Sequence, residues 1–122
     1  MVGDGDEVVM KGNETTVEAV VDPGICGFAC KISVEKTGKR SVKISLSSEC
    51  EQITDLAMKV PRLDMKDIFK PLSRNPVFVS AEESHCHTVC VIPSCILKCA
   101  EVALALALPK NVSFRFVEQH NP

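Results

Sequence analysis

The chain has 122 residues, a size that suits one domain with its own hydrophobic core and no need of covalent staples. Apolar residues make up 45% of it and charged residues 25%, the usual balance of a globular protein. The net charge is -2, no basic patch with interleaved aromatic residues is present, and the only aromatic residues are five phenylalanines. These features argue against a nucleic-acid partner.

The N-terminus reads MVGDGDE, and residues 1–12 of the single domain 1–122 are predicted to be disordered. The segment lacks the basic and apolar regions of a secretory signal. The longest apolar run, residues 100–109, is too short to span a bilayer and contains Glu101. We therefore expect a cytoplasmic protein with no membrane partner, in which thiols stay reduced.

The first half of the chain is predicted to be β-structure. Residues 16–21, 28–35 and 41–48 alternate apolar and polar side chains, which is the period of a strand with one buried face. The turn residues D-P-G follow the first run, and K-T-G-K-R separates the other two runs as a hairpin turn. The three runs predict an antiparallel meander.

The sequence then changes to helical spacing. Residues 49–60 place apolar side chains at helical intervals, with Ser48 as the expected N-cap. Residues 63–69 predict a short helix that Asp64 caps. Residues 71–80 combine two prolines with the β-like run V-F-V-S, and they are left without an assignment.

Residues 93–108 predict the longest helix, because Pro93 suits its first turn and Pro109 follows its end. Residues 112–118 alternate again and predict a C-terminal strand that returns to the sheet. The fold class is therefore α+β, with a small antiparallel β-sheet covered on one face by helices.

The chain contains seven cysteines, an odd number that cannot all pair, and a disulfide framework is the least favoured interpretation in the cytoplasm. Three of them lie where predicted elements meet. Cys26 is in the turn between the first two strands, Cys50 is where the third strand becomes a helix, and Cys90 precedes the longest helix. Turns of a meander return to the same edge of the sheet, so these thiols can converge as metal ligands. Helix N-termini are expected to lower their pKa values.

Two histidines lie close to Cys90 in the sequence. His87 is three residues before it and His85 is five residues before it. An H-x-x-C pair can place an imidazole and a thiolate on one metal ion, and a histidine that faces the solvent is the equally weighted alternative. His120 near the C-terminus is expected to play no part.

The remaining four cysteines carry weaker signals. Cys30 either approaches the same site or faces the core. Cys95 and Cys99 are four residues apart on an apolar helix, where a free cysteine behaves as a small hydrophobic residue, so the core is favoured for both. Cys86 is interpreted as a loop residue.

Three segments, DPGICGFACKISVE, SVKISLSSEC and HCHTVCVIPSCILKCAEVALALAL, resemble NifU/IscU-type iron–sulfur scaffold proteins in order and character. The resemblance covers roughly residues 22–107. It implies an IscU-like α+β sandwich with a three-cysteine site for a nascent iron–sulfur cluster or zinc. The implied ligands are Cys26, Cys50 and either Cys90 or Cys95, with His87 as the companion histidine.

The chain is also similar to a family of small uncharacterised proteins from methanogens and other strict anaerobes. The shared pattern is G-x-C-G-F, a cysteine–glutamate pair after a strand, and C-x-x-P before the last helix. This second resemblance favours Cys90 as the third ligand and implies no activity.

The leading prediction is a cytoplasmic metal-binding module that holds an iron–sulfur cluster or iron through three cysteines. It would act as a scaffold or carrier, with a cluster donor or acceptor protein as its partner. The first alternative is a structural zinc-binding interaction domain in which His87 fills the fourth position. The second is a cysteine-dependent or open-site cluster enzyme, although an enzyme is the less favoured class. A metal-free domain with reduced cysteines is the simplest alternative, and a homo-oligomer is compatible with all of them.

Overall fold

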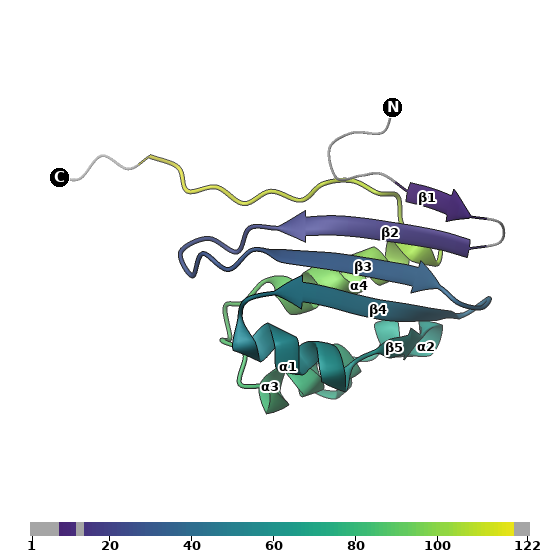
Figure 1. The fold of residues 1–122 in the computed structure, drawn as a ribbon, viewed down its shortest axis with the longest axis horizontal. Helices are drawn as coiled ribbons and strands as arrows, with labels where there is room; N and C mark the ends of the chain where they lie inside the picture. The colour runs from purple at the N-terminus through teal and green to yellow at the C-terminus, as the bar shows by residue number, and fades with distance from the viewer. Residues whose placement is uncertain (1–7, 12–13, 119–122) are drawn as a thin grey trace.

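The computed structural model describes residues 8–11 and 14–118 (Figure 1). It contains a five-stranded sheet in the order β1-β2-β3-β4-β5, in which every neighbouring pair is antiparallel. The strands are β1 (Val8–Lys11), β2 (Glu14–Val21), β3 (Cys30–Lys36), β4 (Ser41–Ser48) and β5 (Arg62–Asp64). The helices are α1 (Glu51–Lys59), α2 (Met65–Ile68), the 3-10 turn η1 (Leu72–Arg74), α3 (Pro76–Glu83) and α4 (Ile92–Ala103).

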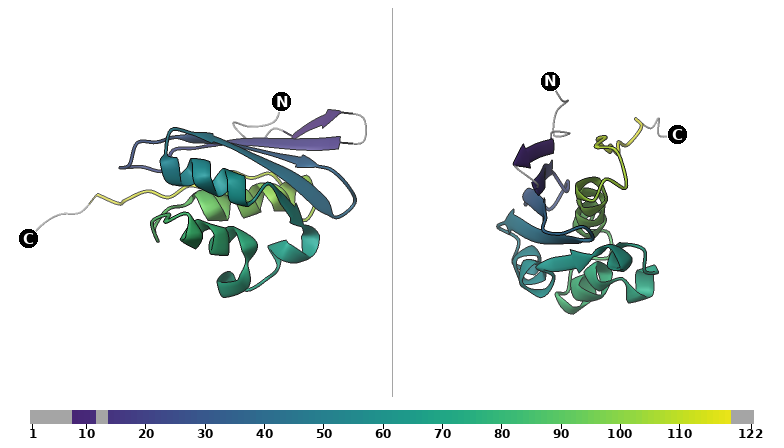
Figure 2. Two further views of the ribbon diagram at one scale, coloured as in Figure 1. Left: turned by 60° about the horizontal axis from the view of Figure 1, so that its bottom comes forward. Right: turned by 90° about the vertical axis from the view of Figure 1, so that its right-hand side faces the viewer.

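The three central strands confirm the predicted meander. In β3, Cys30, Ile32 and Val34 are buried on one face, and Ile32 lies between Ala19 of β2 and Leu46 of β4. The residues between these three in β3 point to the other face of the sheet, which is open to solvent. All helices lie on the buried face of the sheet (Figure 2). The α+β class with one covered face is therefore observed, as the sequence predicted.

The core forms where α4 crosses β2 and β3 and where α1 lies along β4. On α4, Ile96, Ala100 and Ala103 are buried, and on α1, Ile53 and Leu56 are buried. The two alanines let the helix approach the sheet closely, and the branched side chains fill the space between the layers.

The caps explain where the short helices begin. Asp64 caps α2 as predicted: its side chain accepts a hydrogen bond from the Lys66 amide at 3.1 Å, and Asp67 accepts one from the Asp64 amide at 2.9 Å. The predicted N-cap of α1 is wrong, because the cap is Cys50 and Ser48 instead accepts a hydrogen bond from the Cys50 amide at 3.1 Å.

The long helix ends five residues earlier than the predicted end at residue 108. Ala105 adopts a left-handed conformation with φ 61°, its amide donates to Val102 O, and the Leu106 amide donates to Glu101 O. These two bonds form a Schellman motif, which satisfies the last carbonyl groups and turns the chain away from the helix axis. The apolar run therefore continues past the helix as extended chain.

The predicted C-terminal strand is wrong. Residues 112–118 pair with no strand in the described part of the chain and lie exposed. Two short strands, β1 and β5, complete the sheet instead. Residues 8–11 form β1 within the segment predicted to be disordered, whereas residues 1–7 and 12 lie outside the described residues, as does His120.

The unassigned residues 71–80 form η1 and most of α3. Asn75 caps α3 and Pro76 occupies its first turn, so the β-like run V-F-V-S is helical. Among the described helices, none is both long and apolar enough to cross a membrane.

Candidate metal centre

Cys26 lies on a turn that its own sequence shapes. Asp22 Oδ1 accepts a hydrogen bond from the Gly24 amide at 3.1 Å, and the Gly27 amide donates to Gly24 O at 2.9 Å. Both glycines have positive φ values, 96° and 75°, which side chains rarely tolerate. The turn therefore presents Cys26, which is exposed, at the end of the sheet between β2 and β3.

Cys50 occupies the junction between β4 and α1. It is half-buried, and its thiol donates a hydrogen bond to Gln52 Oε1 at 3.2 Å. As the N-cap, its side chain makes no hydrogen bond to the amides of the first helical turn. The sulfur is thus held beside the start of the helix by a side-chain partner and by the Ser48 bond to its backbone.

The connection between α3 and α4 supplies two more thiols. The Cys86 amide donates to Ala81 O and the Cys90 amide donates to His87 O, each at 3.0 Å. Both cysteines are half-buried, whereas His85 and His87 are exposed. The two imidazoles therefore face solvent on the same connection that holds the two sulfurs.

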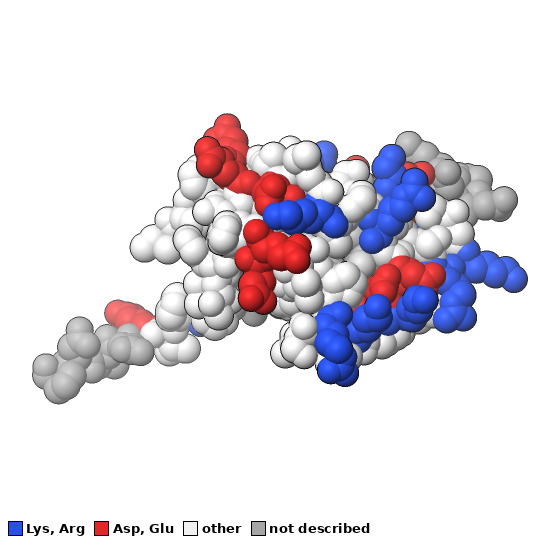
Figure 3. All heavy atoms as spheres, turned by 90° about the horizontal axis from the view of Figure 1, so that it is seen from below, with Lys and Arg blue, Asp and Glu red and all other residues white. Residues whose placement is uncertain are grey.

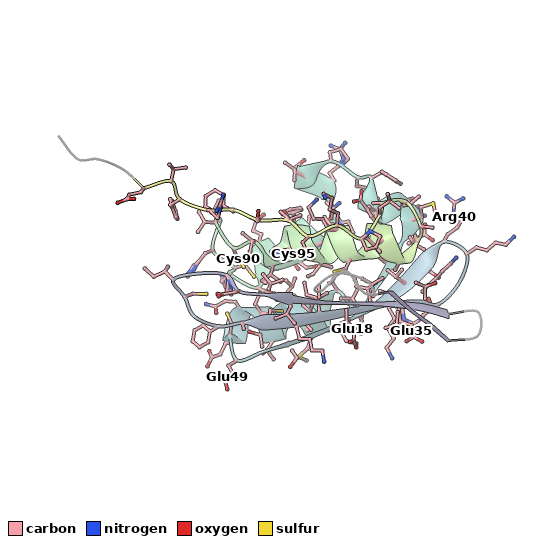
Figure 4. The ribbon with its side chains drawn as sticks, turned by 90° about the horizontal axis from the view of Figure 1, so that it is seen from above. Glu18, Glu35, Arg40, Glu49, Cys90 and Cys95 are labelled. Atoms are coloured by element: carbon pink, nitrogen blue, oxygen red, sulfur yellow. The ribbon has the colours of Figure 1, made fainter. Side chains whose placement is uncertain are left out.

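The other three cysteines lie in or against the core. Cys30 and Cys99 are buried, which confirms the core prediction for Cys99 and places Cys30 on the inner face of the sheet. Cys95 is half-buried at the edge of the core. In Figure 4, Cys90 and Cys95 lie on the helix side of the sheet, at the end where α4 begins.

The pKa of Cys90 depends mainly on burial and, to a smaller extent, on two thiols from other loops. Burial raises the pKa of Cys90, thiolate charge on Cys50 and then on Cys26 raises it further, and the backbone N–H of Ile92 partly opposes this. The turn before β3, the start of α1 and the α3–α4 connection share one end of the molecule (Figure 1). The fold therefore brings together loops that are far apart in the sequence.

The same holds for two other thiols. Burial raises the pKa of Cys30 to about 11, with smaller contributions from Cys90, Cys95 and Cys50. Burial also raises the pKa of Cys86 to about 11, with contributions from Cys90 and Cys50. The seven thiols lie on the loops at this end of the molecule, at the start of β3 and in the first turns of α4, and are here called the thiol cluster: Cys26, Cys30, Cys50, Cys86, Cys90, Cys95 and Cys99.

The expected lowering of thiol pKa values at helix starts is wrong for Cys90, because desolvation outweighs the single hydrogen bond from Ile92. Within residues 8–11 and 14–118, no three histidine, cysteine, aspartate or glutamate side chains are grouped to hold a metal ion. The donors are nevertheless the soft sulfur ligands that zinc and iron–sulfur clusters take. Binding requires the loop thiols to draw closer and to lose their protons.

Sequence reasoning treated Cys86 as a plain loop residue, yet its thiol interacts with both Cys90 and Cys50. The C-x-x-x-C spacing of Cys86 and Cys90 was the available signal. Gln52, the hydrogen-bond partner of Cys50, was also missed, and nothing in its position marked it.

The charged residues are unevenly distributed over the surface. Figure 3 shows acidic side chains toward the end where α1 begins and basic side chains toward the end that holds α2 and the β3–β4 turn. The acidic end includes Glu49 and Glu51, and the basic end includes Lys39, Arg40 and Lys66. The thiol cluster therefore lies at the acidic end.

We expect the folded chain to lose stability between about pH 9 and pH 11. Burial raises the pKa of Cys30 and Cys99 from 9.0 to about 11. The unfolded chain therefore releases these protons first as the pH rises, which favours unfolding by roughly 1–3 kcal/mol for each buried thiol. Urea unfolding of the reduced, metal-free protein at several pH values measures this.

The matched control is Cys99→Ala, which removes one of the thiols whose pKa burial raises to about 11. Its stability should fall less steeply over the same pH range than that of the wild type. Equal slopes in the two proteins would show that Cys99 does not titrate as its burial requires.

Together, the fold and the thiol cluster define a small α+β domain with a cysteine-rich end. The chain belongs to DUF6951, a family of unknown function, whose profile matches residues 17–116. Nothing matches the chain among the curated proteins or the solved structures compared with it. The family assigns no activity and does not test the NifU/IscU resemblance, which stays a prediction.

Proposed function

We propose that this protein is a metal-binding module in which Cys26, Cys50 and Cys90 hold an iron–sulfur cluster or an iron ion. The observation that carries the proposal is that three separate loops, which hold Cys26, Cys50 and Cys90, lie at one end of the molecule (Figure 1). Thiolates drawn together from these loops would repel one another, and a cation among them would turn that repulsion into attraction. Proton loss by the thiols is then driven by metal binding.

The order of elements supports the same ligand set. Cys26 follows a strand, Cys50 joins a strand to a helix, and Cys90 precedes the last helix, as the NifU/IscU resemblance implies. His87 is exposed on the turn that carries Cys90 and is the proposed fourth ligand, with His85 as the less favoured one. Cys30 remains less favoured because it is buried within the core, and Cys95 remains less favoured because it lies on α4 and not on one of the three loops.

The position of the site favours a carrier or scaffold over a structural metal. Cys26 is exposed and Cys50 and Cys90 are half-buried, so a bound cluster would be accessible to a donor or acceptor protein. The domain has an aliphatic core between sheet and helices, whereas domains with structural zinc sites usually draw their folding energy from the metal. The structural zinc domain is therefore the second candidate, and the cysteine-dependent enzyme the third.

The test is reconstitution of the purified, reduced full chain without oxygen. We expect iron and sulfide to give a brown protein with broad absorption near about 400 nm, which is typical of cysteine-ligated clusters. A colourless protein that binds stoichiometric zinc and no iron would instead support the second candidate, the structural zinc domain. A protein that takes up neither metal would contradict metal binding and leave the thiols as core or redox residues.

A further inference from the structure

The segment after α4 is an extended, apolar tail that its own domain leaves uncovered. Phe114 and Phe116 are 82% and 87% exposed, and their rings meet edge-on with centroids 5.3 Å apart. Val112 and Val117 are exposed as well. The alternating run that they form has the pattern of a strand with one apolar face, and the DUF6951 match extends through it to residue 116. We name residues 112–117 the tail strand.

The sheet has an open edge that can receive such a strand. The pairing of β1 with β2 ends at Val17, which is opposite Val8. Among the described residues, no strand pairs with residues 18–21 on that side of β2. An unpaired edge of this kind is a template for another strand.

The β2 edge and the tail strand match in the positions of their apolar side chains. On β2, Ala19 and Val21 point to the helix side and pack against the core, whereas Val20 is exposed on the open face. In a tail strand laid beside them, Phe114 and Phe116 would take the helix side. Side chains of successive residues alternate between faces, so one register satisfies the whole run.

The β2 edge and the tail strand also carry opposite charges. When the phenylalanines face the helices, Arg115 falls on the open face with Glu18 of β2. Neither residue has an ion-pair partner in the described part of the chain. Opposite charges on neighbouring strands stabilise the pairing and specify the register.

We propose that the tail strand of one copy pairs with residues 18–21 at the β2 edge of a second copy, and that two copies exchange tails reciprocally. In the single chain the tail runs back along the helix layer, away from the sheet, and its end projects past the sheet (Figures 1 and 2). The connecting residues 104–111 reach up to about 28 Å when extended, enough to cross to a neighbour. Each copy offers one tail and one edge, so a two-fold dimer closes with both satisfied.

The first test measures the mass of the full chain in solution as a function of concentration, with amide exchange of the tail. We expect a dimer at micromolar concentration whose tail amides are protected from exchange. A monomer with an unprotected tail would overturn the proposal. A monomer with a protected tail would overturn it too, because the tail would then pair within its own chain.

The second test changes the tail. The double variant Phe114→Asp/Phe116→Asp should weaken dimerisation at least about tenfold, because it would bury two charges at the interface. The matched control Phe69→Asp alters an exposed phenylalanine at the end of α2 and should leave the dimer intact. An unchanged dimer in the tail variant, or an equal loss in the control, would overturn the proposal.

The third test reads the register. Glu18→Arg or Arg115→Glu alone should weaken the dimer several-fold, about fivefold for a surface pair, and the two together should restore most of the loss. Both residues are exposed, so the domain folds in every variant. If the double variant is no better than the singles, the proposed pairing of Glu18 with Arg115 is wrong. Metal content of the dimer variants should equal that of the wild type, which keeps this inference separate from the proposed function.

Discussion

Replacing Cys50 with serine should lower the iron or zinc bound by the reconstituted protein by more than tenfold. The change removes one of three soft thiolates and leaves a hydroxyl group, which is a much weaker ligand for these metals. Anaerobic metal analysis together with the absorption spectrum measures the loss.

The fold of the metal-free protein should survive this substitution. Cys50 is the N-cap of α1 and makes no capping hydrogen bond, whereas serine is among the best N-cap residues. Urea unfolding of apo Cys50→Ser should therefore match or slightly exceed the wild type in stability. A metal loss that merely followed unfolding would contradict the assignment of Cys50 as a ligand.

Cys95→Ser is the matched control, because it removes a half-buried thiol from the same thiol cluster. We expect it to keep its metal, in line with Cys90 as the third ligand. If Cys95→Ser loses metal while Cys90→Ser retains it, the third ligand lies on α4. If Cys50→Ser and the wild type bind equal amounts, the three-thiol site is wrong.

Asn75→Ala should destabilise the folded chain by about 2–4 kcal/mol. The buried side chain donates to three backbone carbonyl groups and accepts a hydrogen bond from the Val77 amide at 3.1 Å. The donor distances to Asp67 O, Ile68 O and Lys70 O are 3.1, 3.4 and 3.3 Å. Alanine would leave these groups without the partner that closes α2 onto α3.

Urea unfolding compares this variant with Ser73→Ala, an exposed polar change two residues away that should alter stability by less than about 0.5 kcal/mol. A loss below about 1 kcal/mol in Asn75→Ala would mean that water replaces these hydrogen bonds. The α2–α3 connection would then contribute little to the fold.

Local sequence determined the central meander and the caps. The two-residue alternation in β2, β3 and β4 can bury only one face, so the strands and their inner residues follow directly from the pattern. The Asp64 cap is equally local, because the capping box needs only Asp67 three residues later. The position of Cys26 on a glycine turn also follows from neighbouring residues.

Tertiary contacts decided the rest. The run V-F-V-S has strand propensity but is helical in α3, because Asn75 caps the helix and also binds three carbonyl groups within residues 67–70, which holds α3 against α2. Residues 112–118 have a strand pattern but no strand partner among the residues that the structure describes, and a pattern cannot reveal whether a neighbouring strand exists. Residues 8–11, V-V-M-K, belong to the segment predicted to be disordered, yet they form β1 because β2 offers them an edge.

For the candidate metal site, too, some features follow from the sequence and others only from the tertiary structure. The sequence by itself identified Cys26, Cys50 and Cys90 as thiols at element ends, since each adjoins a turn or a helix start. The tertiary structure decided that their loops share one end of the molecule and that Cys86 joins them. It also decided that burial raises the pKa of Cys90, because desolvation depends on atoms from distant segments that no local pattern specifies.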